Sequence, residues 1–224
     1  MPESSSASSQ HTVLDVRSLR FSYGTQVVLN IERFRLNAGS SMAVLGPSGC
    51  GKTTFLHLLA GLLVPAQGSI RVMNQVITQM DQAPLDRFRG RHIGMIFQKL
   101  FLIPGLTVRE NIALAQRLAR KPPNSERVDN LLQQLELSAL QNNKPNTLSQ
   151  GQAQRVAIAR ALAHDPVLVF ADEPTSALDD DRAQSAIDLL KQSAHSAGAS
   201  LLIVTHDQRV RGELDAEFEM EPLS

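Results

Sequence analysis

The feature that most constrains this chain is a glycine-rich segment at residues 46–53, which reads G-P-S-G-C-G-K-T. It follows the apolar run 42–45 and precedes a helical pattern at 52–63, as the phosphate-binding pattern G-x-x-x-x-G-K-[ST] requires. Glycines let such a loop turn its backbone N–H groups inward, and the start of the helix adds a partial positive charge. We therefore expect a strand, a phosphate-binding loop and a helix in succession. The alternative is a glycine-rich turn that binds nothing.

Individual positions of this segment have different expected roles. Lys52 is expected to reach the β- and γ-phosphates, Thr53 to supply a hydroxyl ligand to Mg²⁺, and Thr54 to add a phosphate contact. Cys50 is expected to be a spacer with no chemistry; the alternative is a thiol that the nearby helix start makes reactive when the site is empty. The loop positions expected to bind the nucleotide through their backbone are Gly46, Pro47, Ser48, Gly49, Cys50 and Gly51.

A second group of candidate residues ends the apolar run 168–171, which is directly followed by Asp172 and Glu173. A buried strand that ends beside the phosphate loop would place Asp172 where a carboxylate holds Mg²⁺ through its water shell. Glu173 would then lie near the γ-phosphate and could accept a proton from the attacking water as general base. The alternative is that two acidic residues simply end a strand and cap the next turn.

The pattern of apolar residues predicts an α/β fold. Apolar runs between residues 13 and 45 are broken at Tyr23-Gly24 and Ala38-Gly39, as in strands joined by tight turns. The apolar spacing changes to about 3.6 between residues 107 and 163, which indicates helices. Further strands are expected at 69–73, 93–97, 167–171, 201–204 and 218–220, with a crossover helix at 180–197.

These elements together predict a P-loop NTPase core with an antiparallel β subdomain and an inserted all-helical subdomain. The expected boundaries are a disordered lead at 1–11, a core formed by 12–97 and 164–224, and a helical subdomain at 98–163.

A third motif narrows the class of nucleotide-binding protein. Leu148-Ser149-Gln150-Gly151-Gln152 stands before an amphipathic helical pattern that continues as R-V-A-I-A-R-A-L at 155–162. Both segments resemble the signature region of the ATP-binding subunits of ABC transporters, and the resemblance extends from residue 13 onward. It implies a Q-loop at Gln98, a D-loop at residues 176–179 (Ser-Ala-Leu-Asp) and a switch histidine at His206.

The resemblance also implies how these residues act. Gln98 would contact magnesium and water, His206 would contact the γ-phosphate and orient water or Glu173, and Tyr23, the only tyrosine, would stack on adenine. Packing and solvent exposure are the plainer explanations for Tyr23 and His206.

Two chains would pair head to tail, with each ATP between the phosphate loop of one and the signature of the other, at Ser149, Gly151 and Gln152. Gln150 stands where the family usually has glycine, so its backbone must suit a residue with a Cβ.

Composition limits the partners of such an ATPase. Lys+Arg and Asp+Glu both number 22, so the zero net charge argues against a nucleic-acid partner. The short basic run 87–92 is better explained as a solvated face. No apolar run approaches the roughly 20 residues that cross a bilayer, so we expect a cytoplasmic protein that drives a separate integral membrane permease. A single cysteine agrees with a reducing compartment.

The region after the Q-loop suggests where that permease binds. The apolar residues 100–106 would dock it, or would instead fill the core between the lobes. Residues 89–98 and 102–111 resemble the lipoprotein-release and macrolide-export branch of the family, which implies export or lipid extraction. The alternatives are an importer ATPase and a non-transport ABC ATPase acting on nucleic acid or ribosomes. A phosphate-loop kinase or GTPase is disfavoured because Asn143-Lys144 is not followed by the aspartate of a guanine-reading motif.

Overall fold

An antiparallel sheet forms one layer of the molecule. The structure, a computed structural model, describes residues 11–176 and 178–223, so the lead expected at 1–11 lies outside it except for His11. Two long strands pair as a hairpin through a turn at Gly24, whose φ of 59° is the left-handed conformation that favours glycine. In spatial order the strands are β2 (Gln26–Asn37), β1 (Thr12–Tyr23), β4 (Gln67–Val72) and β5 (Gln75–Val76).

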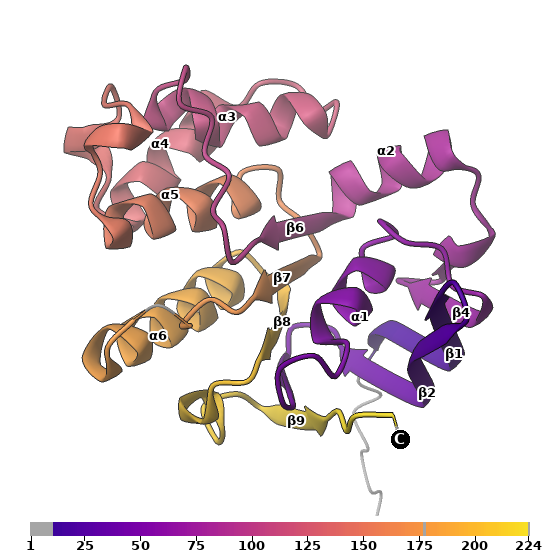
Figure 1. The fold of residues 1–224 in the computed structure, drawn as a ribbon. Helices are drawn as coiled ribbons and strands as arrows, with labels where there is room; N and C mark the ends of the chain where they lie inside the picture. Colours follow the sequence, from indigo (N-terminus) through magenta and orange to yellow (C-terminus); the bar gives the residue numbers. More distant parts are fainter. Residues whose placement is uncertain (1–10, 177, 224) are drawn as a thin grey trace, which may run out of the picture.

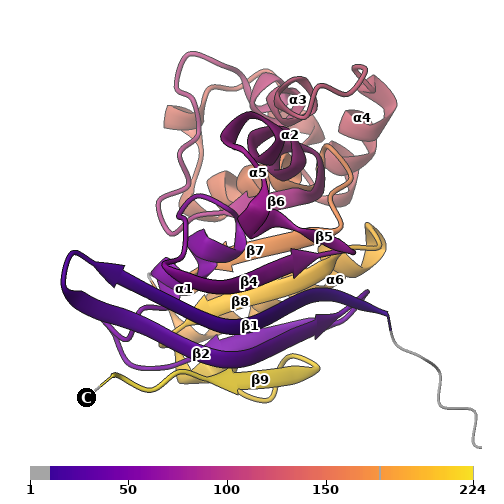
Figure 2. The same cartoon turned by 90° about the vertical axis from the view of Figure 1, so that its right-hand side faces the viewer.

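A five-stranded parallel sheet forms the second layer (Figures 1 and 2). It confirms the strands expected at 93–97, 167–171 and 201–204, each within one residue at either end. The strand expected at 218–220 begins two residues earlier. In spatial order the strands are β6 (Ile93–Ile96), β7 (Leu168–Asp172), β8 (Ser200–Thr205), β3 (Ser41–Leu45) and β9 (Ala216–Glu219).

The helices lie on both faces of this parallel sheet. Helix α1 (Lys52–Leu59) follows β3, and α6 (Asp180–Ser196) connects β7 to β8. Between β6 and β7 the chain forms a helical lobe, which Figure 1 shows above the sheet. Its helices are α3 (Val108–Leu118), α4 (Ser125–Gln134) and α5 (Gln150–Leu162), with 3₁₀ turns η2 (Ser138–Leu140) and η3 (Pro145–Thr147). Two further 3₁₀ turns are η1 (Ile77–Gln79) and η4 (Gln208–Val210).

Helix α1 is shorter than the pattern at 52–63 predicts. Gly61 takes a φ of 65°, its N–H donates to the Leu58 carbonyl over 3.0 Å, and the Leu62 N–H donates to the His57 carbonyl over 2.8 Å. These are the two hydrogen bonds of a Schellman motif, which ends a helix at a left-handed glycine. The apolar residues that follow therefore belong to a loop.

Helix α2 (Gln82–His92) was not predicted. Its sequence is mostly polar and basic, and only Leu85 and Phe88 are buried. Two apolar residues three positions apart are too few to reveal a helical period. The basic run 87–92 is the C-terminal half of this helix, and its Arg87 and Arg91 side chains are exposed.

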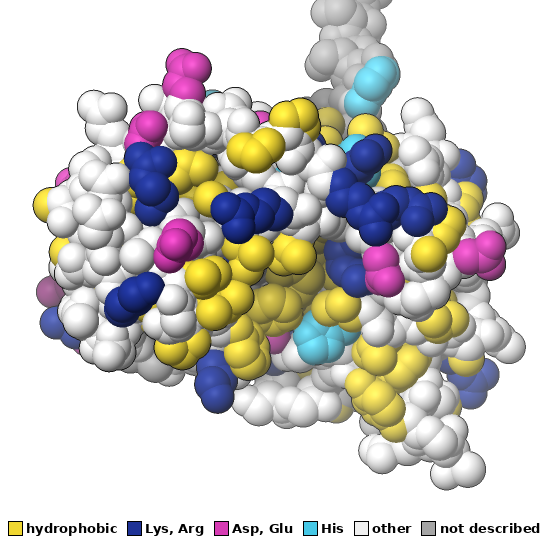
Figure 3. Space-filling model, turned by 90° about the horizontal axis from the view of Figure 1, so that it is seen from above, with side chains coloured by type: hydrophobic (Ala, Val, Ile, Leu, Met, Phe, Trp, Pro, Cys, Tyr) yellow, Lys and Arg dark blue, Asp and Glu magenta, His cyan; other side chains and the backbone are white. Residues whose placement is uncertain are grey.

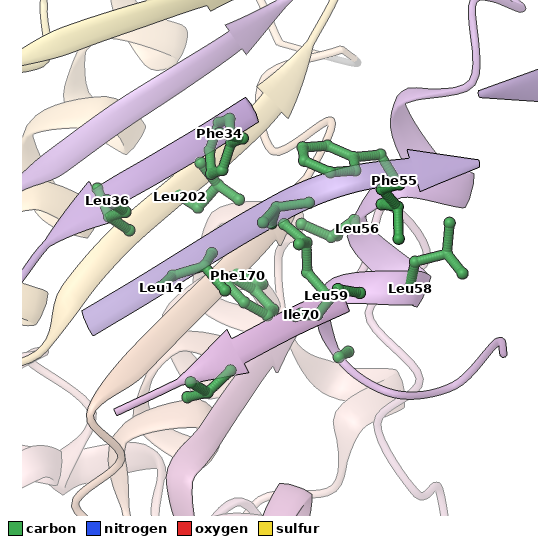
Figure 4. Packing of buried hydrophobic residues seen from close by; sticks show 14 of the residues in the cluster. Leu14, Phe34, Leu36, Phe55, Leu56, Leu58, Leu59, Ile70, Phe170 and Leu202 are labelled. Carbon is green, nitrogen blue, oxygen red and sulfur yellow. The ribbon is translucent and has the colours of Figure 1, made fainter. Parts of the chain in front are cut away.

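The parallel sheet separates two hydrophobic cores. On one face, Phe170 and Leu202 pack with the antiparallel sheet and α1, as Figure 4 shows with Leu14, Phe34 and Phe55. On the other face, Val169 and Ile203 pack with α6 and the helical lobe. Because neighbouring residues of a strand point to opposite faces, the central strands are apolar without interruption. The phosphate loop starts at the carboxyl end of β3, at the edge where β7 and β8 also end.

Candidate functional site

The phosphate loop has backbone geometry that only glycine allows at two positions. Gly49 has a φ of 85°, and Gly51 has a φ of 99° with Leu29 Cδ2 only 2.8 Å from the place of a Cβ. At the start of the loop, a Cβ on Gly46 would lie 2.5 Å from the carbonyl oxygen of Met220, so the residue directly after β9 packs closely against the loop. The conformation thus depends on β2 and on the chain after β9 as well as on the motif. Its exposed positions are Pro47, Ser48 and Gly49.

The Lys52 ammonium group lies inside this loop. The residue is only 5% exposed, and its Nζ donates to the carbonyl oxygens of Gly46 and Pro47 over 2.8 and 2.9 Å. A buried cation in a loop of glycines at a helix start fits the phosphates of a nucleotide. Thr54, two residues after Lys52, is half-buried at the same helix start.

Thr53 and Asp172 are brought together from the two sequence motifs. The Thr53 hydroxyl donates to Asp172 Oδ1 over 3.0 Å. Burial raises the pKa of the Asp172 carboxyl, while the hydrogen bond from Thr53 opposes that change. A hydroxyl and a carboxylate side by side are hard oxygen donors, so this pair fits Mg²⁺.

Glu173 is held in a left-handed backbone conformation, with a φ of 47°, that is costly for any residue except glycine. Its N–H donates to the Val204 carbonyl over 2.9 Å, which continues the pairing of β7 with β8. The carboxylate accepts from the Thr205 hydroxyl over 2.7 Å and lies 3.9 Å from Lys52 Nζ. Contacts from β8 therefore fix this carboxylate beside the lysine of the phosphate loop.

His206 contacts this same carboxylate. Its Nδ1 lies 2.8 Å from Glu173 Oε1, its backbone N–H donates to that oxygen over 3.2 Å, and the rest of the ring is exposed. Gln98 reaches the site indirectly: its Nε2 donates to Ser176 Oγ over 3.3 Å, and that hydroxyl donates to the Glu173 carbonyl over 3.1 Å. The sequence-predicted Gln98, Glu173 and His206 thus belong to one cluster.

Thr205 and Ser176 complete this cluster and were not singled out from the sequence. Thr205 carried a usable signal, because it ends β8 directly before His206, and β8 pairs with the strand that carries Asp172. Ser176 was assigned only to the D-loop, whose Ala177 lies outside the described residues.

The signature residues lie at the start of α5 in the helical lobe. Ser149 is the N-cap: its Oγ accepts from the Gln152 N–H over 3.3 Å, and the Gln152 Oε1 accepts from the Ser149 N–H over 2.9 Å. This reciprocal capping box occupies both side chains within the chain. A Cβ on Gly151 would meet nothing within 4 Å, so the helix start is open. Gln150 is the first residue of the helix, a conformation that suits a side chain, so the usual glycine is not required.

The thiol of Cys50 does not face the open side of the loop, which agrees with the default interpretation of a spacer and disfavours the alternative of a reactive group. The residue is 5% exposed and packs in the core below the loop, and its Sγ lies 2.8 Å from the place of a Cβ on Gly46. Only its backbone remains available to a nucleotide. Tyr23 is 54% exposed at the end of β1, where its ring meets Phe21 edge to face.

No helix within residues 11–176 and 178–223 is long and apolar enough to span a bilayer.

Comparison with known proteins connects this geometry to one family. A family model described as ABC transporter matches residues 29–176, which is more than half of the chain. The lipoprotein-releasing system ATP-binding protein LolD of Hydrogenovibrio crunogenus is 37% identical over 198 residues, which cover 88% of this chain and 86% of LolD. The LolD of Syntrophotalea carbinolica is 40% identical, with 86% of each chain covered. The spermidine/putrescine import protein PotA of Haemophilus influenzae is 39% identical, with 88% of this chain but 52% of PotA covered.

Solved structures share the fold. A dimeric structure of the ATP-binding cassette MJ0796, in a post-hydrolysis state with ADP and Pi, matches with a TM-score of 0.82. The two chains are 32% identical, and the match covers 94% of this chain and 97% of the other. CbiO1 of Clostridium perfringens, part of the transporter complex cbiONQ, matches with a TM-score of 0.85 at 28% identity.

Proposed function

Because the chain belongs to the family of ABC transporter ATP-binding proteins, we propose that its cluster around Glu173 hydrolyses magnesium-bound ATP to power a separate membrane subunit. The observation that most directly supports this proposal is the position of the Glu173 carboxylate, which contacts Thr205 and His206 and lies 3.9 Å from Lys52 Nζ. A base placed between a phosphate-binding cation and a histidine suits the attack of water on a terminal phosphate.

Each residue of the phosphate site has a separate task in this proposal. Backbone N–H groups of the loop and the Lys52 ammonium bind the phosphates, and Tyr23 offers an aromatic face to the base. Thr53, Asp172 and Gln98 would hold Mg²⁺, directly or through water. When bound, the ion would neutralise charge on the phosphate oxygens.

Proton transfer depends on Glu173 and its neighbours. Thr205 and the His206 N–H donate to the carboxylate, so its orientation is fixed before substrate arrives. His206 is exposed on its other side, where its ring can meet the γ-phosphate or the attacking water. The left-handed backbone of Glu173 is the kind of local strain that clusters at active sites, which agrees with this role.

A second chain would complete the site. The start of α5 is open to solvent at Gly151 and lies in the helical lobe, apart from the phosphate loop of the same chain. Pairing head to tail would place Ser149, Gly151 and Gln152 of each chain on the nucleotide of the other. The dimeric cassette MJ0796 is similar over 97% of its length, which supports this arrangement.

The membrane subunit would dock on the face that carries α2 and α3. Figure 3 looks onto this face and shows hydrophobic side chains lining a hollow, with Lys and Arg side chains around it. Phe101 and Ile103, within the predicted segment 100–106, are 59% and 41% exposed, whereas Leu102 packs against the core of the lobe. Docking would hold the protein at the cytoplasmic side of the membrane.

The segment 100–106 is rigid enough to present those side chains. Asn111, fully buried, accepts from the Ile103 N–H over 2.8 Å and donates to the carbonyls of Leu106 and Thr107 over 3.2 and 2.9 Å. A buried side chain therefore fixes the loop shape without a partner.

The two LolD relatives, similar over most of their length, favour lipoprotein or lipid extraction as the transported process. The similarity to PotA keeps import as a second candidate. Purification from native membranes, followed by identification of the integral membrane chain that copurifies, distinguishes the two.

Glu173→Gln tests the catalytic proposal. The amide cannot accept a proton, so hydrolysis should fall by about 10² or more while ATP still binds. Retained ATP should hold two chains together, which light scattering in saturating ATP and magnesium detects. Glu126→Gln, an exposed change at the start of α4, is the matched control and should behave as wild type. Wild-type turnover by Glu173→Gln would refute the assignment of the base.

A further inference from the structure

Beyond the residues that meet ATP, one arginine connects the segments that carry the catalytic cluster. Arg209 lies in η4, three residues after His206. Its guanidinium faces Asp207: Nε donates to Oδ1 over 2.8 Å, and Nη2 donates to Oδ2 over 2.7 Å. Such a two-point contact fixes the plane of the guanidinium as well as its position.

The same guanidinium also holds the segment after Glu173. Nη1 donates to the Leu178 carbonyl over 3.2 Å and to Asp180 Oδ1 over 2.8 Å, and Nη2 donates to the Thr175 carbonyl over 3.4 Å. Leu178 belongs to the D-loop, whereas Thr175 directly precedes it and Asp180 directly follows it at the start of α6. One side chain thus bridges η4 and the segment 175–180.

Asp207 strengthens this bridge from the other end. Its side chain is 9% exposed, and its Oδ2 accepts from the Thr175 hydroxyl over 2.6 Å. The hydrogen bonds from Arg209 are the main cause that holds the pKa of the Asp207 carboxyl well below its usual range. The pair therefore stays ionised throughout the pH range in which enzymes of this kind are assayed.

The bridged segment is the one that contacts the catalytic residues. Ser176 donates to the Glu173 carbonyl and accepts from Gln98, while Thr205 and His206, directly before Asp207, bind the Glu173 carboxylate. In contrast, residues 176, 179 and 180 are exposed and gain little from packing. Arg209 connects their neighbours Thr175 and Leu178, and Asp180 itself, to the segment that follows His206.

We propose that Arg209 is a positioning residue that fixes Thr175, Leu178 and Asp180 relative to the segment of His206, and thereby sets the rate of hydrolysis at Glu173. It should also affect the pairing of two chains, because Leu178 lines the same pocket as Ser149 and Gly151. The proposal rests on the hydrolytic function proposed above. The role proposed is one of position, because Nε, Nη1 and Nη2 of Arg209 donate to Asp207, Leu178, Asp180 and Thr175.

The test compares Arg209→Gln and Arg209→Lys with the control Arg211→Gln. Arg211 lies two residues away and bonds to Gln208, Glu217 and Glu219 at the surface, so its loss should change nothing at the site. Arg209→Gln should bind ATP with wild-type affinity and lower kcat at least tenfold, with KM within twofold. In the Glu173→Gln background it should weaken ATP-driven dimer formation at least tenfold.

The lysine variant separates positioning from charge. A lysine can pair with Asp207, but its single ammonium cannot also reach the carbonyls of Thr175 and Leu178. We therefore expect Arg209→Lys to keep the melting temperature near wild type and to remain impaired in kcat. Recovery of wild-type kcat by Arg209→Lys would overturn the proposal, as would wild-type kcat and dimer formation in Arg209→Gln.

Two further outcomes also decide whether the positioning role and the proposed function hold. If Arg209→Gln loses ATP binding together with kcat, Arg209 supports the fold as a whole, and the positioning role is wrong. If the wild-type protein itself hydrolyses no ATP, the proposed function fails before this inference is reached.

Discussion

Protonation of one buried histidine should make the protein unstable in mild acid. His164 follows α5 and is 5% exposed. Its Nε2 lies 3.2 Å from the Ile93 carbonyl oxygen and donates to it in the neutral tautomer, whereas its Nδ1 is buried with no partner among the described residues. Burial, together with the positive charge of Lys121, lowers the pKa of His164 from 6.5 to about 4.

The direction in which stability changes with pH follows from proton binding to the folded and unfolded chains. Between pH 6.5 and 4 the unfolded chain binds a proton at His164 and the folded chain does not, so stability rises with pH across this window. The stabilisation that the neutral His164 contributes is fully present above pH 6.5 and is lost as the pH falls to 4. At about 1.4 kcal/mol for each pH unit, the full loss is about 3 kcal/mol. For a domain of this size that corresponds to a fall of roughly 6–12 °C in the melting temperature.

The assay is thermal unfolding from pH 7.5 to 4.5 for wild type and His164→Gln. Glutamine can still donate to the Ile93 carbonyl but does not titrate, so its melting temperature should fall less steeply over this range. The exposed His11, changed to glutamine, is the control and should reproduce the wild-type curve. Parallel curves for wild type and His164→Gln would refute the reasoning.

Two other predictions follow from the burial of Cys50 and from the exposure of Phe101. Thiol reagents should label Cys50 slowly in the folded protein and rapidly in urea, because its Sγ packs in the core; rapid labelling of the native protein, measured by mass spectrometry, would contradict this. Phe101→Glu should leave ATPase activity and melting temperature nearly unchanged but uncouple transport, because the ring is exposed on the proposed docking face. Leu102→Glu should instead lower stability by about 1–3 kcal/mol and reduce both activities together, since it places a charge at a half-buried position packed against the core of the lobe. Normal transport by Phe101→Glu would remove the docking assignment.

The sequence predicted those parts of the site that lie within single motifs. The loop 46–53 has the expected strand before it and helix after it, and Asp172 ends the expected strand and meets Thr53. These predictions succeed because a phosphate loop needs left-handed glycines at fixed positions and because consecutive parallel strands end at one edge.

Contacts that depend on the packing of separate segments were not predictable. Arg209 follows His206 in a stretch with no pattern, and its partners at 175–180 become neighbours only when β7 and β8 pair. The side chain of Cys50 packs in the core with its Sγ beside Gly46, which no local spacing reveals. Helix α2 has too few apolar residues to show a period.

The division of the interior into two cores has a consequence for how such a chain can diversify. The phosphate loop and α1 rest on one core, and α5 with the proposed docking loop rests on the other, with only the five-stranded sheet between them. Substitutions that reshape the helical lobe for a different membrane subunit would therefore leave the packing beneath the phosphate loop intact. The helical lobe can therefore change to bind a different membrane subunit while the core that holds the phosphate loop keeps its structure.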